Sequence, residues 1–291
     1  MNRLVPNPRP RAAWTATSFY RWLVWPPVIV AALFFIVPMA TLLVRSVSDP
    51  AVGLGNYHRV FFTGPYVRVL WLTVETATIV VVLCLILAYP FAFAMTKARG
   101  SLLRIMGAMV LITLWTSVVI RSYGWMVVFQ RRGVLNQALV ATGISDDPIN
   151  FIPGSLAVHV GMVHIMLPFM IVPLVASMRS IDQSLLSAAS VMGATPWQGF
   201  LKIFLPLSLP GVAAGCALVF MMSLGFFITP ALLGGPRHMM AAVLIEQQAN
   251  SLLDWGLASA LSAVLLAVTT AIYLVYLRVT QGSGRGGLHA H

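Results

Sequence analysis

The chain has 291 residues, of which 59% are hydrophobic and 9% are charged, and its mean hydropathy is +0.90. Soluble domains carry about 25% charged residues, so this composition excludes a soluble globular domain and favours an integral membrane protein. The formal net charge of +11 would also suit a nucleic-acid partner. No basic recognition helix is present, however, so we expect no nucleic acid among the partners.

Three regions follow one another along the chain. Residues 1–22 are predicted to form a basic cytoplasmic arm near the membrane surface, residues 23–280 a six-helix membrane domain, and residues 281–291 a flexible, glycine-rich tail. A spanning helix needs about 20 apolar residues. The runs that meet this length are Trp25–Val44, Leu70–Met95, Leu102–Ile120 (with an extension to Phe129 left open), Ser155–Val175, Gly211–Leu233 and Leu257–Leu277.

The distribution of basic residues predicts the orientation of these spans. With the N-terminus inside the cell, eleven of the eighteen Lys and Arg residues fall on the inner side. Positive charge is enriched on that side of membrane proteins. We therefore expect both termini in the cytoplasm, together with the loop that joins the fourth and fifth spans.

Several residues are candidates for a solute pathway. Glu75 is an acid inside a predicted span, where a charge is costly and marks a functional site by default. It faces a central cavity and attracts an ammonium group, or it is a structural acid hydrogen-bonded to a neighbouring helix, or it lies close enough to the membrane interface to stay hydrated. The predicted pathway residues are Glu75, Trp115, Tyr123, Phe226, Phe227, Thr229 and Glu246.

The other pathway candidates have equally plain alternatives. The aromatic faces of Trp115 and Tyr123 would attract a cation, although such residues also mark membrane interfaces. An unwound helix end at the stretch SLGFFITP, residues 223–230, would expose backbone carbonyls to a pathway; ordinary packing is the alternative. Glu246 lines the extracellular mouth of the pathway or meets a partner protein, or it is a solvated residue of the last extracellular loop.

Catalysis and metal binding find no support in the sequence. No P-loop, zinc-protease or nucleophile-elbow motif is present. His159 and His164 are five residues apart, so they point in different directions on a helix, and we expect no shared metal site. Cys84 and Cys216 lie in apolar runs and are predicted to be core residues. The chain is therefore expected to be no enzyme and to hold no cofactor.

The stretch SAASVMGATPWQGFLKIFLP, residues 187–206, is too polar to span a membrane. Asp182 is a helix-start signal for a first helix, Gln183–Met192, which Gly193 would end in the left-handed conformation. Thr195 would cap a second helix, which Leu205-Pro206 would stop. The small side chains of the first helix predict a bare face that inserts into a groove on another protein; an interfacial hairpin without a partner is the alternative.

This stretch resembles the EAA loop of ABC importer permeases, the coupling helix that docks on the ATPase. Ser187 stands where that family usually has Glu. The resemblance implies a coupling role for Ser187, Ala188, Ala189, Gly193, Ala194, Thr195, Lys202, Leu205 and Pro206. The segments Arg121–Leu139, Leu233–Gln248 and Asp254–Ser262 resemble permeases of the spermidine/putrescine type.

The resemblance implies a type I ABC importer permease fold (MetI-like), all-α, with a cytoplasmic coupling helix-turn-helix, in the bacterial inner membrane. It implies four partners: a second homologous permease subunit, a cytoplasmic ATPase dimer that carries the ATP and Mg, a periplasmic solute-binding protein, and membrane lipid. The implied solute is a polyamine such as spermidine or putrescine. The alternatives are another small solute (an amino acid derivative, opine or phosphonate), or a stand-alone secondary transporter.

Overall fold

The computed structural model describes residues 16–284, and the side chains of residues 23–278. All regular structure in this part of the chain is helical, as the sequence predicts. The helices long and apolar enough to cross a membrane lie in α1 (Ala16–Ser48), α3 (Tyr66–Lys97), α7 (Ser155–Arg179), α10 (Leu205–Leu224) and α13 (Trp255–Gly284). A bent sixth unit joins α4 (Gly100–Trp115) to α5 (Val118–Phe129) and α6 (Val134–Ala141).

Helix α7 forms the centre of the bundle. It packs against α3 and α10 along its length, and also contacts α4, α5 and α11 (Ile228–Leu233). Its inner face carries Met162, Met166, Met170 and Met178, all completely buried. Unbranched methionine side chains adapt to irregular gaps between helices, so this row fills the core of the bundle.

Two glycines four residues apart, Gly211 and Gly215, bring α10 close to α7. A Cβ atom on Gly215 would lie 2.7 Å from the Met170 Sδ and 3.3 Å from its carbonyl oxygen. Small residues at this spacing let membrane helices approach closely, because packing rather than hydrophobicity drives their association in lipid. The contact fixes α10, and with it the segment that precedes α10, against the bundle.

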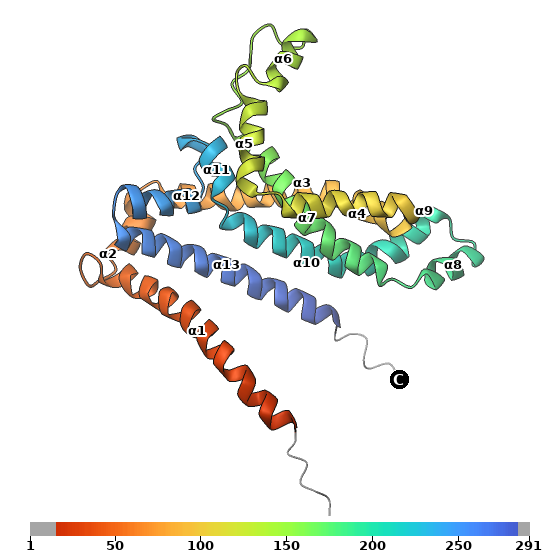
Figure 1. The fold of residues 1–291 in the computed structure, drawn as a ribbon, viewed down its shortest axis with the longest axis horizontal. Coiled ribbons are helices and arrows are strands. Elements are labelled where there is room, and N and C mark those ends of the chain that lie inside the picture. Colours follow the sequence, from red (N-terminus) through yellow and green to blue (C-terminus); the bar gives the residue numbers. More distant parts are fainter. Residues whose placement is uncertain (1–15, 285–291) are drawn as a thin grey trace, which may run out of the picture.

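The third predicted span is not one helix. Helix α4 ends at Trp115, and Thr116 and Ser117 are extended before α5 begins, so the two parts meet at 97°. The prediction of a continuous helix from Leu102 to Ile120 was therefore wrong. The Ile112 carbonyl accepts both the Thr116 N–H at 3.0 Å and the Thr116 hydroxyl at 2.7 Å, a side-chain bond to the preceding turn that Ser and Thr commonly form. In Figure 1, α5 rises steeply from its contacts with α7 and α11, and α6 at its far end stands away from the bundle.

The fifth predicted span is also broken. Helix α10 ends at Leu224, and α11 begins at Ile228. The break lies within residues 223–230, the stretch for which an unwound end and ordinary packing were both left open, and the prediction of a single helix over Gly211–Leu233 was wrong. Beyond α11 the chain forms the short elements η3 (Pro236–His238), α12 (Ala241–Glu246) and η4 (Gln247–Ser251) before α13.

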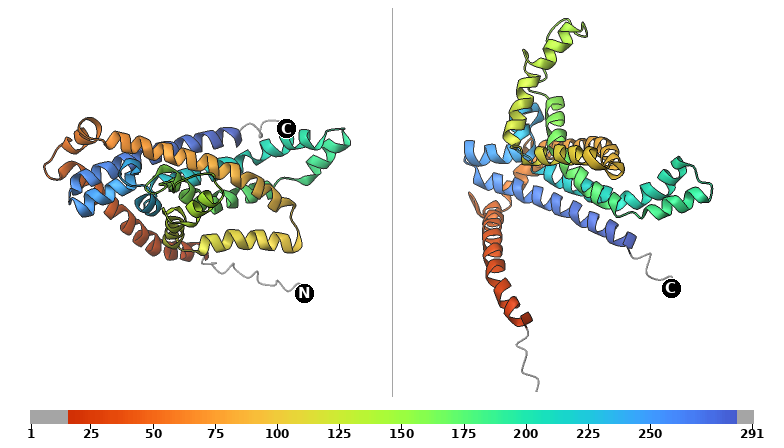
Figure 2. Two further views of the ribbon diagram at one scale, coloured as in Figure 1. Left: turned by 90° about the horizontal axis from the view of Figure 1, so that it is seen from above. Right: turned by 45° about the vertical axis from the view of Figure 1, so that its right-hand side comes forward.

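Helix α1 is held mainly at one end. Asn56, in α2 (Gly55–His58), donates to the carbonyl oxygens of Ser46 at 3.2 Å and Asp49 at 2.6 Å, and the Ser46 and Tyr57 hydroxyls lie 2.9 Å apart. From this junction α1 runs beside α13 and then diverges from it (Figures 1 and 2). No residue of its apolar window is buried, so this face is free to meet lipid or another chain.

Candidate functional site

A helical hairpin, α8–α9, lies at the opposite end of the bundle from α2 and α12 (Figure 1). Asp182 caps α8 (Gln183–Val191) by accepting a hydrogen bond from the Ser184 N–H at 2.8 Å. The side chain and backbone of Ser184 together hold the pKa of the Asp182 carboxyl below its usual value. Gly193 then turns the chain with a φ of +88°, a conformation that suits glycine at a helix end. The predicted start and end of the first helix are confirmed.

The second arm begins with α9 (Pro196–Gly199). The Thr195 hydroxyl accepts from the Gln198 N–H at 3.3 Å, and the Gln198 side chain accepts from the Thr195 N–H at 3.0 Å. This reciprocal capping box satisfies two backbone donors, and Pro196 occupies a first-turn position, where its missing N–H costs nothing. The predicted cap is confirmed.

The predicted stop at Leu205-Pro206 was wrong. The chain continues from α9 through the π-helical turn η2 (Phe200–Phe204) directly into α10. The Leu205 N–H bonds to the Phe200 carbonyl, and the wider turn comes immediately before Pro206, which lies in the first turn of α10. A proline inside a helical path lacks an N–H and its ring crowds the preceding turn, and the wider π-helical turn is the local adjustment that accompanies it here. The hairpin arm and α10 therefore form one continuous helical path.

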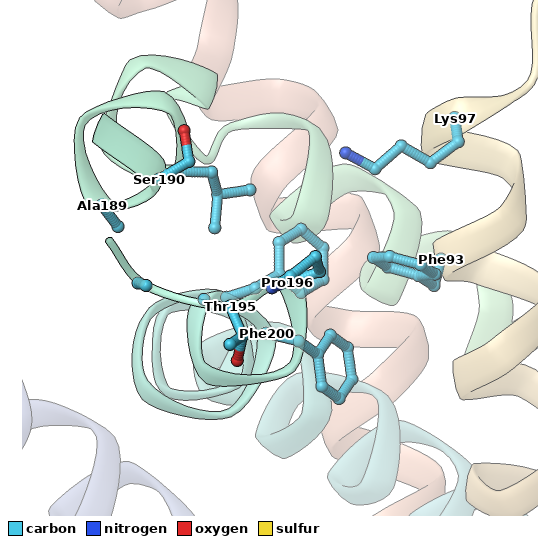
Figure 3. A pocket seen from close by; sticks show the side chains of 11 residues that line it. Phe93, Lys97, Ala189, Ser190, Thr195, Pro196 and Phe200 are labelled. Carbon is cyan, nitrogen blue, oxygen red and sulfur yellow. The ribbon is translucent and has the colours of Figure 1, made fainter. Parts of the chain in front are cut away.

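Aromatic packing joins the hairpin to the bundle. The Phe200 ring meets Phe93 of α3 edge-to-face at 5.5 Å and stacks on Trp197 at 5.8 Å. Lys97, at the end of α3, donates to the Gln183 side-chain oxygen at 3.1 Å. Between these contacts lies a cavity of about 360 Å³, shown in Figure 3, whose lining includes Phe93, Lys97, Ala189 and Phe200. The hairpin is thus braced against the end of α3.

The predicted coupling residues divide between two surfaces. Ser187 and Ala188 are exposed, whereas Ala189 and Ala194 line the cavity, so the two neighbouring alanines do not form one bare outward face as expected. The apolar outer surface comes instead from the hairpin tip, where Val191 and Met192 are 88% and 87% exposed. Thr195, Lys202 and Pro206 are also exposed, and Gly193 meets nothing at its Cβ position.

At the opposite end, an inner pocket of about 310 Å³ lies between α3 and α7 and includes η3 in its wall. Its polar lining includes Glu75, Thr76, Ser155, His159 and His238. Glu75 is exposed, and the His159 Nε2 is buried without a hydrogen-bond partner among the described residues. The sequence predicted Glu75, but the neighbourhood of the two histidines was missed, because it depends on chain segments far apart in sequence.

A larger outer cleft of about 660 Å³ adjoins the inner pocket, since Leu72 and His238 line both. Arg68, Arg237 and His238 give it a basic lining. Within the described residues neither arginine forms an ion pair; the ion pair that is present joins Arg59 to Asp254 at 2.8 Å. The outer cleft therefore has a positive potential next to the carboxylate of Glu75.

A second polar cluster lies where α5 crosses α7. The Trp125 Nε1–H donates to the His164 Nδ1 at 3.1 Å, and the Arg121 Nε and Nη1 are buried without hydrogen-bond partners among the described residues. Ser122 and the completely buried Thr229 share a hydrogen bond of 2.8 Å between α5 and α11. Thr229 thus joins two helices in this conformation. The sequence analysis assigned no role to Arg121.

The remaining predicted pathway residues do not come together. Trp115 is 89% exposed at the end of α4, and Tyr123 is exposed on α5. Phe226 and Phe227 form the link between α10 and α11, with Phe226 half-buried. The Glu246 carboxylate accepts from the Asn250 side chain at 3.4 Å. Of the predicted set, Glu75 alone lines either of the two pockets at this end.

No described group of three or more His, Cys, Asp or Glu side chains is arranged to hold a metal ion. Cys84 and Cys216 are free, and Cys84 is buried. His159 faces the inner pocket while His164 bonds Trp125, so the two histidines act separately.

Comparison with known sequences identifies the family. The profile of a family described as "Binding-protein-dependent transport system inner membrane component" matches residues 52–282. The chain belongs to this family. It is a transport permease of the bacterial inner membrane, with several membrane-spanning helices.

Individual relatives have more specific names. The chain is 32% identical to the spermidine/putrescine transport system permease protein PotB of Haemophilus influenzae over 87% of this chain and 92% of that protein. It is 35% identical to PotB of Escherichia coli over 78% of this chain and 82% of that protein. A molybdenum transport system permease protein, ModB of Mycobacterium bovis, is 29% identical over 89% and 94%. The names of these relatives therefore refer to different transported solutes.

Solved structures show the same fold. A permease chain from a bacterial alginate ABC transporter, in complex with a periplasmic protein bound to an alginate pentasaccharide, matches with a TM-score of 0.72 and 19% identity, over 91% of this chain and 96% of that one. An inward-facing methionine ABC transporter matches with a TM-score of 0.57 and 18% identity, over 74% and 94%. The type I importer permease fold expected from the sequence is confirmed.

Proposed function

We propose that this chain is the permease subunit of an ATP-driven importer and forms part of the pathway for a small polyamine such as spermidine or putrescine. The polyamine assignment is supported by the names of the relatives at 32% and 35% identity. The observation that carries the importer mechanism is the braced hairpin α8–α9. It exposes an apolar tip at Val191 and Met192 and is continuous with α10.

The hairpin is proposed to dock on an ATPase dimer in the cytoplasm, which would hold the ATP and Mg and carry out hydrolysis. This chain would hold no cofactor and perform no catalysis. An exposed apolar surface on a projecting element is typical of a protein interaction site. The Ala188 side chain lies beside this tip and is exposed, so a partner surface would approach the backbone closely there. The predicted docking residues outside the cavity include Ser187, Ala188, Gly193 and Lys202.

Motion of the docked hairpin would reach the membrane part by two routes. One is the unbroken helical path from α9 through η2 into α10, and the other is the contact of Phe200 with Phe93 and of Gln183 with Lys97 at the end of α3. Closure of the ATPase on ATP would favour one arrangement of the bundle and hydrolysis would release it. This is a two-state equilibrium biased by ligand binding.

A second, homologous permease subunit is proposed to complete the pathway. The support is α1, which diverges from the bundle and exposes large apolar side chains such as Phe34 and Phe35. A periplasmic solute-binding protein would dock at the α12 end. Both termini would lie in the cytoplasm, in agreement with the excess of basic residues on that side.

Reconstitution tests the proposal. The four components (this chain, the partner permease, the ATPase and the binding protein) are placed in proteoliposomes, and uptake of radiolabelled spermidine and putrescine is measured with ATP. We expect ATP-dependent uptake that disappears when any one component is omitted. Uptake by this chain alone would instead indicate a stand-alone secondary transporter. Uptake of amino acid derivatives, opines or phosphonates without polyamines would reject the polyamine assignment.

A further inference from the structure

We propose that the inner pocket between α3 and α7 binds one primary ammonium group of the transported solute, through the Glu75 carboxylate and the His159 Nε2. The inference rests on the proposed role of the chain in solute import. It does not depend on the solute being a polyamine, since many small nitrogenous solutes carry such a group.

The first observation is the isolation of Glu75. It is the one acidic residue within the described membrane-spanning helices, and the structure gives its side chain no hydrogen bond or ion pair. Two of the acids outside these helices have partners: Asp254 pairs with Arg59, and Asp182 caps α8. An acid within a spanning helix is a functional candidate by default, and because the Glu75 side chain is exposed and lines the pocket, it is available to a cationic ligand.

The second observation is the unsatisfied imidazole. The His159 Nε2 is buried without a hydrogen-bond partner among the described residues, although buried polar atoms usually have one. His159 and Glu75 line the same pocket and are close enough to interact electrostatically. Two groups that lack partners therefore converge on one cavity from α3 and α7.

The chemistry of an ammonium group matches these acceptors. It has three N–H donors and no acceptor. The carboxylate of Glu75 takes the charge, the neutral imidazole of His159 accepts a second N–H, and the hydroxyls of Thr76 and Ser155 are available for the third. At about 310 Å³ the pocket is at the small end of the range for ligand sites, which suits the end of a solute rather than all of a long polyamine.

The outer cleft determines what lies beside the ammonium. Arg68, Arg237 and His238 would repel a second positive charge placed there. A diamine would therefore direct its other end away from the outer cleft, whereas an amino acid could place its carboxylate within it. Two ligands with the same four-carbon spacer, 1,4-diaminobutane and 4-aminobutanoate, separate these cases.

The test measures equilibrium binding of both radiolabelled ligands to the complete permease–ATPase complex, held with ATP and a hydrolysis-deficient ATPase. For the ligand that binds the wild type, we expect Glu75→Gln and His159→Leu each to raise the Kd about tenfold or more, the loss expected for a charge-assisted hydrogen bond. Glu75→Asp should give an intermediate Kd. Asp146→Asn, an exposed acid away from the pocket, is the matched control and should leave the Kd unchanged.

The outcomes separate this inference from the proposed function. Binding of 4-aminobutanoate but not 1,4-diaminobutane, weakened by Glu75→Gln, would reject the polyamine assignment and support the ammonium site. Wild-type Kd values in Glu75→Gln and His159→Leu, with diamine uptake retained, would reject the site and leave the polyamine assignment standing. Binding of neither ligand to the wild type would also overturn the site. If Glu75→Gln fails to assemble, an unchanged Kd in His159→Leu is sufficient to reject it.

Discussion

The approach of α10 to α7 at Gly211 makes a quantitative prediction. A Cβ atom on Gly211 would overlap the Ser177 Cβ and would lie 2.8 Å from the Ser177 Oγ and 3.1 Å from the Pro173 carbonyl oxygen. A change of the Ser177 rotamer would move its Oγ but not its Cβ, and neither this Cβ nor the Pro173 carbonyl can move without the backbone of α7. Overpacking of this kind costs about 1–3 kcal/mol. The change from Gly to Ala in a helix returns about 1 kcal/mol.

We therefore expect Gly211→Ala to lower the free energy of unfolding by about 1 kcal/mol, and Gly211→Leu by about 3 kcal/mol or more. Gly107→Ala is the matched control, because Gly107 lies within α4 and its Cβ position meets nothing within 4 Å. That change should be neutral or should stabilise the protein by up to about 1 kcal/mol.

Thermal unfolding in detergent, followed with a thiol-reactive fluorophore, provides the assay. Cys84 is completely buried in α3, with its Sγ 3.7 Å from the Val163 carbonyl of α7, so it reacts when the bundle opens. Each kcal/mol should move the midpoint by about 2–4 °C. A midpoint for Gly211→Ala equal to or above that of Gly107→Ala would refute the close contact between α7 and α10.

Three further predictions concern the hairpin and the α1–α2 junction. Gly193→Val should reduce co-purification of the ATPase, because a φ of +88° costs a β-branched residue about 1–2 kcal/mol; Gly193→Asn should retain more of it, and equal losses would argue against a backbone cause. Asn56→Leu should lower stability by about 1–3 kcal/mol in the fluorophore assay, since it removes the donor to two carbonyls; an unchanged midpoint would show that water replaces it. Arg59→Gln should change stability by less than about 1 kcal/mol, because the Arg59 side chain is 44% exposed; a large loss would mean that the pair with Asp254 is shielded from solvent.

The features that sequence analysis predicted well are local ones. The Asp182 and Thr195 caps and the Gly193 turn each depend on backbone groups within a few residues, so residue type and spacing are sufficient. The start of α7 at Ser155 was likewise marked by the change from polar to apolar sequence. The predicted fold followed from the number of apolar runs and from the family resemblance.

The features that were missed depend on distant contacts or on backbone detail. The break at Thr116 and Ser117 lies inside an apolar run, so hydropathy does not reveal it. The helix through Leu205 and Pro206 continues because a π-helical turn precedes the proline, a local adjustment that propensity does not encode. The inner pocket needs the packing of α3, α7 and η3, which brings His159 and His238 to Glu75 from separate parts of the chain.

The central claim is that a separate ATPase drives this permease through the α8–α9 hairpin. Its most direct test is ATP-dependent solute uptake by the reconstituted transporter carrying Ala188→Trp, with Thr142→Trp, an exposed residue at the end of α6, as control. Both side chains are exposed, so neither change should alter the thermal midpoint. We expect Ala188→Trp to abolish ATPase binding and uptake and Thr142→Trp to retain both; wild-type ATPase binding and uptake in Ala188→Trp would contradict the account.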